Sequence, residues 1–214
     1  MYVPEHFAAE DSDALIAALA RRCAGILISV GASGQPVASH IPILWDAKDK
    51  IARGHIARAN PQWKLGAGRG LIVLAGAEAY VSPTFYPSKA EHGKVVPTWN
   101  YEAVHLSGAV EWFDDAARLK GVVRDLSALH EADRANAWSI DDAPPSYIDA
   151  MLRGIVGVEM RVEKVEAKRK LSQNKGTADF EGVIAGLSRG DTSDAAISAL
   201  MLGVRAPSDD PAGE

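Results

Sequence analysis

The residues of this chain best suited to bind an anion lie in the stretch GHIARANPQW, residues 54–63. His55, Arg58 and Asn60 precede Pro61, a residue that favours the first turn of a helix. Backbone N–H groups and the helix dipole attract an anion at such a start, and the guanidinium group of Arg58 offers planar donors that match a phosphate. The alternative is that Asn60 only caps the helix and that Arg58 is solvated. The sequence leaves both interpretations open.

A second group of hydrogen-bonding side chains opens the stretch PTWNYEAVHLSG, residues 97–108. Trp99, Asn100 and Tyr101 either plug the end of a barrel or face a ligand, and their local chemistry does not decide between the two. His105 follows on the polar side of a strand, without a carboxylate that would support a general base. We therefore expect His105 to be structural.

The dense basic run of the chain is KVEAKRKLSQNKG, residues 164–176. Runs of this kind are usually solvated faces, and no helix-turn-helix pattern surrounds this one. Towards its end the run carries Ser172 and Gln173, whose donors and acceptors suit the edge of a heterocycle. The run is therefore a weak candidate for an element that recognises DNA.

Composition restricts the function further. The chain of 214 residues carries 23 basic and 28 acidic side chains, a formal charge of −5, which repels nucleic acid and acidic membranes. The motifs of nucleotide hydrolases, Rossmann folds, serine hydrolases and zinc proteases do not occur. The single Cys23 falls where a helix face should pack, so we expect a buried thiol, and no metal site is expected. Without a signal peptide or a long apolar run, the expected location is the cytoplasm.

The pattern of elements indicates a small antiparallel barrel with helices around it, a mainly β fold of the α+β class. Strict alternation from Val104 onwards predicts one long strand, and Pro42 in the run 37–45 argues for a barrel edge or a bulge. A helix is expected from about Asp115 to His130, and two short helices in the tail. Six or seven strands are expected, the clearest at 25–30, 37–45, 51–57, 71–76, 104–112 and 155–167, the last with a bulge at Val165.

Five blocks in order along the chain resemble the PaiB family of FMN-binding negative transcriptional regulators. They are MYVPEHF, SHIP, GHIARANPQW, YVSPTFYPSKAEHGKVVPTWNY and KLSQNK, and they extend from Met1 to about Gly176. The resemblance implies the antiparallel FMN-binding split β-barrel, the fold of pyridoxamine phosphate oxidases, with peripheral helices. It implies FMN as the cofactor, bound at the interface of a homodimer. Residues 1–176 would form the flavin-binding domain, and residues 177–214 a helical extension with a disordered end.

The resemblance also implies which residues hold the flavin. Those matching the phosphate-binding places are Ser39, His40, Ile41, His55, Ala57, Arg58, Asn60 and Pro61. Those expected around the isoalloxazine, or around a ligand above it, are Trp99, Asn100, Tyr101, Lys170, Ser172 and Gln173. In this arrangement PTWNY is a pocket wall near the dimer interface. The oxidases carry an Arg-Leu-His substrate motif where this chain has Lys170 and Ser172, which lack the guanidinium fork and the imidazole. A ligand other than pyridoxamine phosphate is therefore expected.

Four functional hypotheses follow. The first is a cytoplasmic, homodimeric flavin-binding protein that acts in negative regulation of transcription by sensing a small molecule or its flavin. The second is a flavin-dependent oxidoreductase that acts on a small molecule, in which the flavin supplies the redox chemistry. A haem-binding split barrel is the third, and a repressor that grips DNA through the basic run is the fourth. The residues favour small-molecule chemistry over direct contact with DNA.

Overall fold

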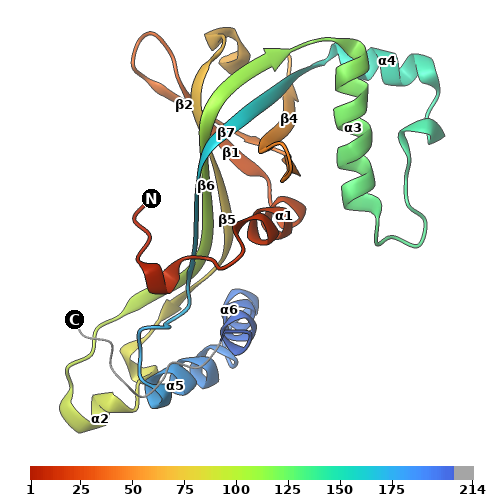
Figure 1. Ribbon diagram of the computed structural model, residues 1–214. Helices are drawn as coiled ribbons and strands as arrows, with labels where there is room; N and C mark the ends of the chain where they lie inside the picture. Colours follow the sequence, from red (N-terminus) through yellow and green to blue (C-terminus); the bar gives the residue numbers. More distant parts are fainter. Residues whose placement is uncertain (205–214) are drawn as a thin grey trace. The chain divides into compact units, whose positions relative to one another are not determined.

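The computed structural model describes residues 1–204, and within them seven strands form one sheet in the order β2-β1-β5-β6-β7-β4-β3 (Figure 1). The pairs β1–β2, β1–β5, β3–β4 and β4–β7 are antiparallel. The strands are β1 (Gly25–Val30), β2 (Pro36–Ile41), β3 (Leu44–Asp46), β4 (Ile51–Ala57), β5 (Gly68–Val81), β6 (Thr98–Phe113) and β7 (Ile155–Lys170). The main helices are α1 (Ser12–Arg22), α2 (Ser88–His92), α3 (Ala116–Glu131), α4 (Pro145–Arg153), α5 (Thr177–Leu187) and α6 (Thr192–Leu202). The predicted antiparallel barrel with peripheral helices is confirmed.

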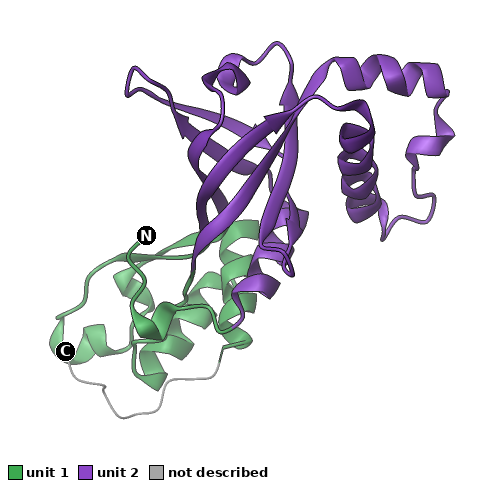
Figure 2. Cartoon of the chain, turned by 45° about the horizontal axis from the view of Figure 1, so that its top comes forward, with its two compact units in different colours: residues 1–10, 76–103, 167–214 green, residues 11–75, 104–166 purple. Residues whose placement is uncertain are grey.

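The chain packs as two compact units (Figure 2). We call residues 11–75 and 104–166 the barrel unit, and residues 1–10, 76–103 and the chain from 167 onwards the helical unit. Strands β5, β6 and β7 each contribute residues to both units. The expected division of the chain at residue 176 stays a prediction.

In the barrel unit, α1 begins at Asp11, whose carboxylate accepts a hydrogen bond from the N–H of Ala14 at 2.9 Å. Leu15 and Leu19 are buried, as their spacing predicts. Cys23 was expected on the same face, but the helix ends at Arg22 and Cys23 is the half-buried residue that follows. Its Sγ donates to the carbonyl oxygen of Leu19 at 3.2 Å, and burial raises the pKa of the thiol.

The expected strand over residues 37–45 is divided in two. β2 ends at Ile41 and β3 starts at Leu44, because Pro42 has no N–H group to give to a ladder. The carbonyl oxygen of Pro42 lies where a side chain at Gly54 would begin, so only glycine lets β4 pass at this point. The break between β2 and β3 therefore has two causes: the missing N–H group of Pro42, and the close approach of β4 at Gly54.

The long strand β6 extends the predicted alternation towards its start. Val104, Leu106 and Val110 are buried as expected, and Asn100 and Glu102 are buried in the same phase. In β7 the alternation of buried and exposed residues breaks at 163–164, where both residues are exposed, close to the predicted bulge. The buried positions at the start of β6 are therefore polar, and buried polar side chains need hydrogen-bond partners.

The helix expected from about Asp115 to His130 is present as α3, with Leu119, Val122 and Leu126 buried on one face at helical spacing. Asp115 caps it, accepting from the N–H of Arg118 at 2.8 Å. In the helical unit the two predicted tail helices are present as α5 and α6, and they pack around Phe180, Val183, Leu187, Ile197 and Met201. The expected disordered end, residues 206–214, lies outside the described residues.

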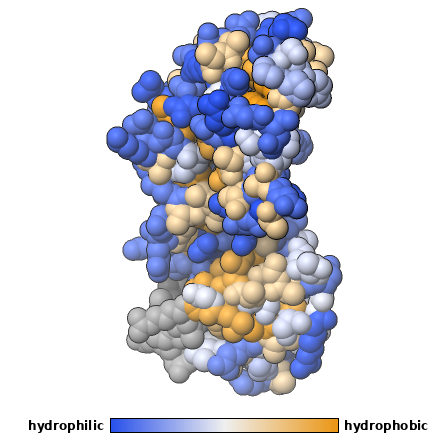
Figure 3. All heavy atoms as spheres, turned by 90° about the vertical axis from the view of Figure 1, so that its right-hand side faces the viewer, coloured by the Kyte–Doolittle hydropathy of each residue, from blue (hydrophilic) through white to orange (hydrophobic). Residues whose placement is uncertain are grey.

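Hydrophobic residues gather in the lower part of the face seen in Figure 3, at the height of α5 and α6 in Figure 1. On α5 and α6, Leu202 is exposed, and Ile184 and Leu200 are half-buried. Within residues 1–204, no helix has both the length and the apolar character needed to cross a bilayer.

Candidate functional site

The structure divides the predicted site residues between the two units. The phosphate-binding set, Ser39, His40, Ile41, His55, Ala57, Arg58, Asn60 and Pro61, belongs to the barrel unit. The set expected around the flavin ring, Trp99, Asn100, Tyr101, Lys170, Ser172 and Gln173, belongs to the helical unit. The use of both sets by a flavin stays a prediction.

The predicted short helix after Asn60 is present as a 3₁₀ helix, η2 (Pro61–Leu65). The Oδ1 atom of Asn60 accepts from the N–H of Gln62 at 2.9 Å, so the residue is a cap, as one interpretation held. Its Nδ2 atom donates to the hydroxyl of Ser39 at 2.7 Å. Asn60 therefore ties η2 to β2 and brings two predicted residues together.

Gln62, which the sequence analysis did not single out, completes this network. It is 1% exposed, and its Nε2 atom donates to the carbonyl oxygens of Leu27 and Val37 at 3.1 and 3.3 Å and to the hydroxyl of Ser29 at 3.2 Å. Its Oε1 atom is buried without a partner among the described residues. A buried amide with this many contacts fixes η2 against β1 and β2.

The side chain of Arg58 is partly committed to the barrel unit itself. Its Nε and Nη2 atoms donate to the carbonyl oxygens of Arg153 and Ile155 at 2.8 and 3.1 Å. Nη1 lies 3.6 Å from Oδ2 of Asp114, a distance beyond a normal hydrogen bond. The guanidinium is thus held in one orientation, and an incoming anion would compete with the carboxylate of Asp114 for the N–H groups on Nη1.

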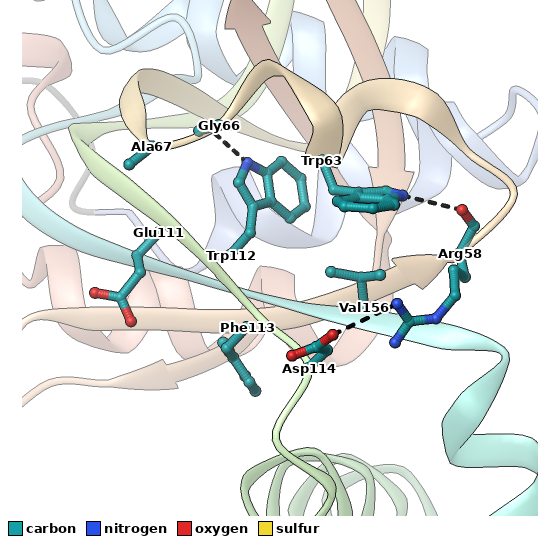
Figure 4. Close-up of a pocket in the computed structure, with 9 residues that line it drawn as sticks. All are labelled: Arg58, Trp63, Gly66, Ala67, Glu111, Trp112, Phe113, Asp114 and Val156. Atoms are coloured by element: carbon teal, nitrogen blue, oxygen red, sulfur yellow. Dashed lines mark hydrogen bonds and ion pairs between the residues drawn. The ribbon is translucent and has the colours of Figure 1, made fainter.

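Beside Arg58 lies a cavity of about 300 Å³ (Figure 4). The indole rings of Trp63 and Trp112 form one side, with Arg58 and Asp114 opposite. Each ring is held by its own N–H group: Nε1 of Trp63 donates to the carbonyl oxygen of Arg58 at 2.9 Å, and Nε1 of Trp112 to that of Gly66 at 3.1 Å. Two fixed flat surfaces beside a cation suit a planar aromatic group that carries negative charge.

The remaining predicted residues of the barrel unit are more scattered. His40 and Ala57 are exposed, Ile41 is buried in the core, and Pro61 opens η2. His55 is half-buried on β4, opposite Gly157 of β7. Burial lowers the pKa of its imidazole. None of these residues lines the cavity beside Arg58.

In the helical unit, Asn100 and Ser172 bind each other. Nδ2 of Asn100 donates to the hydroxyl of Ser172 at 3.0 Å, and this hydroxyl donates to Oδ1 of Asn100 at 3.1 Å. Ser172 has a φ of 64°, a left-handed conformation that costs free energy for a residue other than glycine. Asn100 also lies 3.5 Å from the sulfur of Met201. This buried pair stabilises an unfavourable turn.

Three cations of the basic run, Lys168, Arg169 and Lys170, are engaged by their own chain, whereas Lys164 is exposed. Lys168 is 6% exposed, and its Nζ atom donates to the carbonyl oxygen of Tyr2 at 3.1 Å. Arg169 pairs with the buried carboxylate of Glu102 at 2.8 Å. Lys170 donates to the hydroxyl of Thr98 and, at 2.8 Å, to the carbonyl oxygen of Trp99.

The three remaining side chains of the predicted ring set differ in what they offer. Gln173 folds back on its own backbone: it accepts from the N–H of Leu171 and donates to the carbonyl oxygen of Arg169, both at 2.7 Å. Trp99, by contrast, is 51% exposed and packs edge to face against Tyr80 at 6.0 Å. Tyr101 lies between these extremes, half-buried with the ammonium group of Lys168 5.3 Å from its ring centre.

Sequence reasoning missed Gln62, Trp63, Glu102 and Trp112 as functional or supporting residues. One of them, Glu102, had a detectable signal. Glu102 shares the inward phase of β6 with Val104, so extending the alternation backwards finds it. Trp112 continues the alternation that begins at Val104, but the spacing does not show that it shares a cavity with Trp63.

The cavity allows FMN to be tested against the residues present. A flavin ring is flat and aromatic, which the two indoles match, and its phosphate is an anion, which Nη1 of Arg58 matches. Glu111 and Asp114 also line the cavity and would repel a phosphate placed near them. The residues therefore fit the ring of FMN at the indoles, whereas a phosphate on Nη1 of Arg58 would have to displace the carboxylate of Asp114, which lies 3.6 Å from that atom.

Comparison with known proteins points the same way. A family described as "Putative FMN-binding domain" matches residues 1–164, which confirms FMN as the predicted cofactor. The protease synthase and sporulation protein PAI 2 of Bacillus subtilis is 30% identical over 206 residues, covering 94% of this chain and 96% of that protein.

Solved structures show the same fold at low sequence identity. The conserved hypothetical protein Rv2991 of Mycobacterium tuberculosis superposes with a TM-score of 0.55 at 13% identity, covering 79% of this chain and 91% of that one. The flavocytochrome Anf3 of Azotobacter vinelandii gives 0.54 at 13% identity, with 91% and 78% covered.

Proposed function

The chain belongs to the PaiB family of FMN-binding domains, and from this premise we propose that it is a negative regulator of transcription that senses a small molecule or its own flavin. The name of the Bacillus subtilis relative refers to protease synthesis and sporulation, which is consistent with a regulatory role. The regulator would act in the cytoplasm without gripping DNA itself.

The observation that carries this proposal is the state of the basic run. A DNA-binding surface needs cations that can reach phosphates. Lys168 is buried on a carbonyl oxygen, while Arg169 pairs with a buried carboxylate and Lys170 with the start of β6, so all three already have partners within the helical unit. With the formal charge of −5, this favours regulation through a bound small molecule over direct contact with DNA.

FMN would be held mainly by the barrel unit. We assign its phosphate to Arg58, with Ser39 and Asn60 fixing the backbone nearby, and its ring to the indoles of Trp63 and Trp112. Bound FMN can accept and release electrons, and the chain contributes orientation and charge to that chemistry. In the helical unit, Trp99 and Tyr101 retain ring surface for a ligand, whereas Asn100 and Ser172 support the turn.

We further propose that two protomers pair with the flavin at their interface. The exposed apolar surface at α5 and α6 is of the kind that interfaces cover. Tyr80 and Trp99 add exposed aromatic surface in the same unit, and aromatic residues are enriched in interfaces.

The test is FMN uptake by the purified protein, followed by flavin absorbance and fluorescence quenching. The wild type should bind FMN, and Arg58→Ala should weaken binding by at least about tenfold, because it removes charged hydrogen bonds. Arg58→Lys keeps the charge but loses the paired N–H donors of the guanidinium group, so its affinity for FMN should lie between those of the wild type and Arg58→Ala. Arg161→Ala, at an exposed arginine on β7, is the matched control and should bind like the wild type.

Uptake by Arg58→Ala equal to that of the wild type, with the fold intact by circular dichroism, would show that the phosphate lies elsewhere. No uptake by the wild type would refute flavin binding. Steady turnover of a reduced nicotinamide by the loaded protein would instead favour the oxidoreductase alternative. A salt-dependent DNA shift that is lost on neutralising Lys168, Arg169 and Lys170 would favour the direct repressor.

A further inference from the structure

A groove in the barrel unit crosses the sheet at β5, β6 and β7. Its volume is about 440 Å³, which lies within the range of sites for small molecules. Two of its lining residues, Ala67 and Glu111, also line the cavity beside Arg58, so the groove and that cavity adjoin. The lining residues of the groove are Ala67, Gly68, Ala109, Val110, Glu111, Glu159 and Arg161.

The floor of the groove is formed by small residues. Gly68 has no side chain, and a Cβ atom there would meet no atom within 4 Å apart from its chain neighbours. Ala67 and Ala109 contribute one methyl group each, and both are exposed. Ala109 lies on the outer face of β6, because its neighbours Gly108 and Val110 are buried towards the other face. An open, apolar floor on a sheet suits a flat, apolar ring.

Arg161 supplies the groove with a cation that its own chain leaves unused. The residue is exposed, and its side chain makes no hydrogen bond or ion pair within residues 1–204. Glu159 stands two residues earlier on the same face of β7, but its Oε2 atom accepts from Nε of Arg53 at 2.8 Å and from Nη2 of Arg118 at 2.9 Å. The paired N–H donors of the Arg161 guanidinium group therefore remain available to a ligand.

The two carboxylates of the groove have cations of their own. Glu159 binds Arg53 and Arg118, and Oε1 of Glu111 accepts from Nη1 of Arg118 at 3.0 Å. Among the lining residues, Arg161 is thus the one charge without an opposite charge beside it in the described part of the chain. The two carboxylates would repel a doubly charged phosphate more strongly than a group with a single negative charge. A carboxylate carries one charge and matches the guanidinium group with two oxygen atoms.

We propose that the groove binds a small aromatic monocarboxylate, with its carboxylate on the guanidinium group of Arg161 and its ring on the floor formed by Ala67, Gly68 and Ala109. The carboxylate accepts two parallel hydrogen bonds from the guanidinium group. The ring covers apolar surface that is otherwise exposed. Because the groove adjoins the cavity proposed for the flavin ring, the molecule binds next to the flavin. The inference deepens the proposed function, on which it rests, by naming the class of molecule that would be sensed.

The test uses 2-naphthoate as the probe and the uncharged 2-naphthamide as its matched analogue, in NMR titrations of isotopically labelled full-length protein. We expect saturable binding of 2-naphthoate, with shifts at the Nε–H group of Arg161 and at the methyl groups of Ala67 and Ala109. 2-Naphthamide keeps the ring but lacks the charge, and should bind at least about fivefold more weakly, a difference that water limits in an open groove. Added salt should reduce this difference, because it screens exposed charges.

Two variants test the two contacts separately. Arg161→Gln should bind 2-naphthoate no better than 2-naphthamide, while its affinity for 2-naphthamide stays that of the wild type. Gly68→Phe places a ring in the open space above the floor and should abolish binding of both probes, with the fold checked by circular dichroism. Arg124→Gln removes the same charge at an exposed arginine of α3 outside the groove. This matched control should bind both probes like the wild type.

Three results would overturn the proposal. The first is an absence of saturable binding, and the second is equal binding of the two probes by the wild type. The third is 2-naphthoate binding that Arg58→Ala weakens and Arg161→Gln does not, because the probe then lies in the cavity beside Arg58. Binding that appears only when the protein is diluted to single protomers would show that a second copy covers the groove, and would likewise refute the site.

The outcome is separable from that of the flavin test. Arg161→Gln should take up FMN like the wild type, and Arg58→Ala should bind 2-naphthoate like the wild type. If Arg161→Gln loses FMN instead, Arg161 belongs to the flavin site and the separate groove is refuted. If no form of the protein takes up FMN while 2-naphthoate binds as expected, the flavin proposal fails and the groove stands.

Discussion

The imidazole of His55 links the charge of one side chain to the stability of the barrel unit. Burial lowers its pKa in the folded protein, so below about pH 6.5 the unfolded chain takes up a proton that the folded chain resists. Stability is therefore fully present above pH 6.5 and is lost as the pH falls towards the folded pKa. We expect the free energy of unfolding, measured with urea, to decrease between pH 7.5 and pH 5.5, about one unit either side of the ordinary histidine pKa.

His55→Gln removes the titrating group and should flatten this decrease. It should not abolish it, because burial also lowers the pKa of His105. A decrease that is as steep in His55→Gln as in the wild type would show that His55 is solvated in the folded protein.

Glu102 and Arg169 form an ion pair in which only the carboxylate is buried. The Glu102 side chain is 2% exposed and that of Arg169 is 41% exposed. Replacing Arg169 leaves a buried carboxylate without its cation, whereas replacing Glu102 leaves a cation that water can reach. Arg169→Met should therefore lower the free energy of unfolding by about 2 kcal/mol, and Glu102→Gln by less.

The double variant Arg169→Met/Glu102→Gln completes the cycle in urea unfolding experiments. It should be more stable than Arg169→Met alone, since it removes the stranded charge. Additive losses in the double variant would mean that the two side chains do not depend on each other.

At the scale of elements, two glycines should respond in opposite directions to the same change. A Cβ atom at Gly108 on β6 would overlap the carbonyl oxygen of Arg161 on β7, so alanine must separate two strands. Gly121 in α3 faces open space. We expect Gly108→Ala to cost about 2 kcal/mol or more and Gly121→Ala to stabilise by about 0.5–1 kcal/mol. Thermal unfolding of the matched pair measures both, and a neutral Gly108→Ala would contradict the close approach.

The elements that sequence could predict are those determined by local signals. Helix α3 and the start of η2 at Asn60 and Pro61 depend on spacing and capping alone, and both are confirmed. The sequence shows only one of the two causes of the break between β2 and β3, which is Pro42. The other cause, the close passage of β4 at Gly54, is a contact between segments that spacing does not reveal.

The candidate site shows the same limit. Arg58 was identified from its residue type and position, yet the atoms that orient it are carbonyl oxygens of Arg153 and Ile155, nearly a hundred residues away. Every residue carries a backbone carbonyl oxygen, so the sequence does not show which of them will accept a hydrogen bond from Arg58. Trp63 and Trp112 share a cavity only after β6 has folded beside η2. Which residue types can bind was predictable, whereas which of them meet depends on the tertiary fold.

At the scale of the whole molecule, flavin binding and pairing of protomers should be linked. If FMN lies at the interface of a homodimer, as we propose, a separated protomer holds only part of the site. Ligands that bind only the assembled form stabilise it by mass action. FMN should then raise the thermal unfolding temperature, and this gain should shrink as the protein is diluted.

Sedimentation velocity of the FMN-loaded protein, followed by flavin absorbance over a series of dilutions, tests this linkage. The flavin should sediment with the dimer at high concentration and appear as free flavin where the dimer dissociates, because the two equilibria share one interface. Trp99→Ser, which removes an exposed ring of the helical unit, should shift both transitions to higher protein concentration by the same factor. Flavin that stays bound to a sedimenting monomer would place the whole site within one chain.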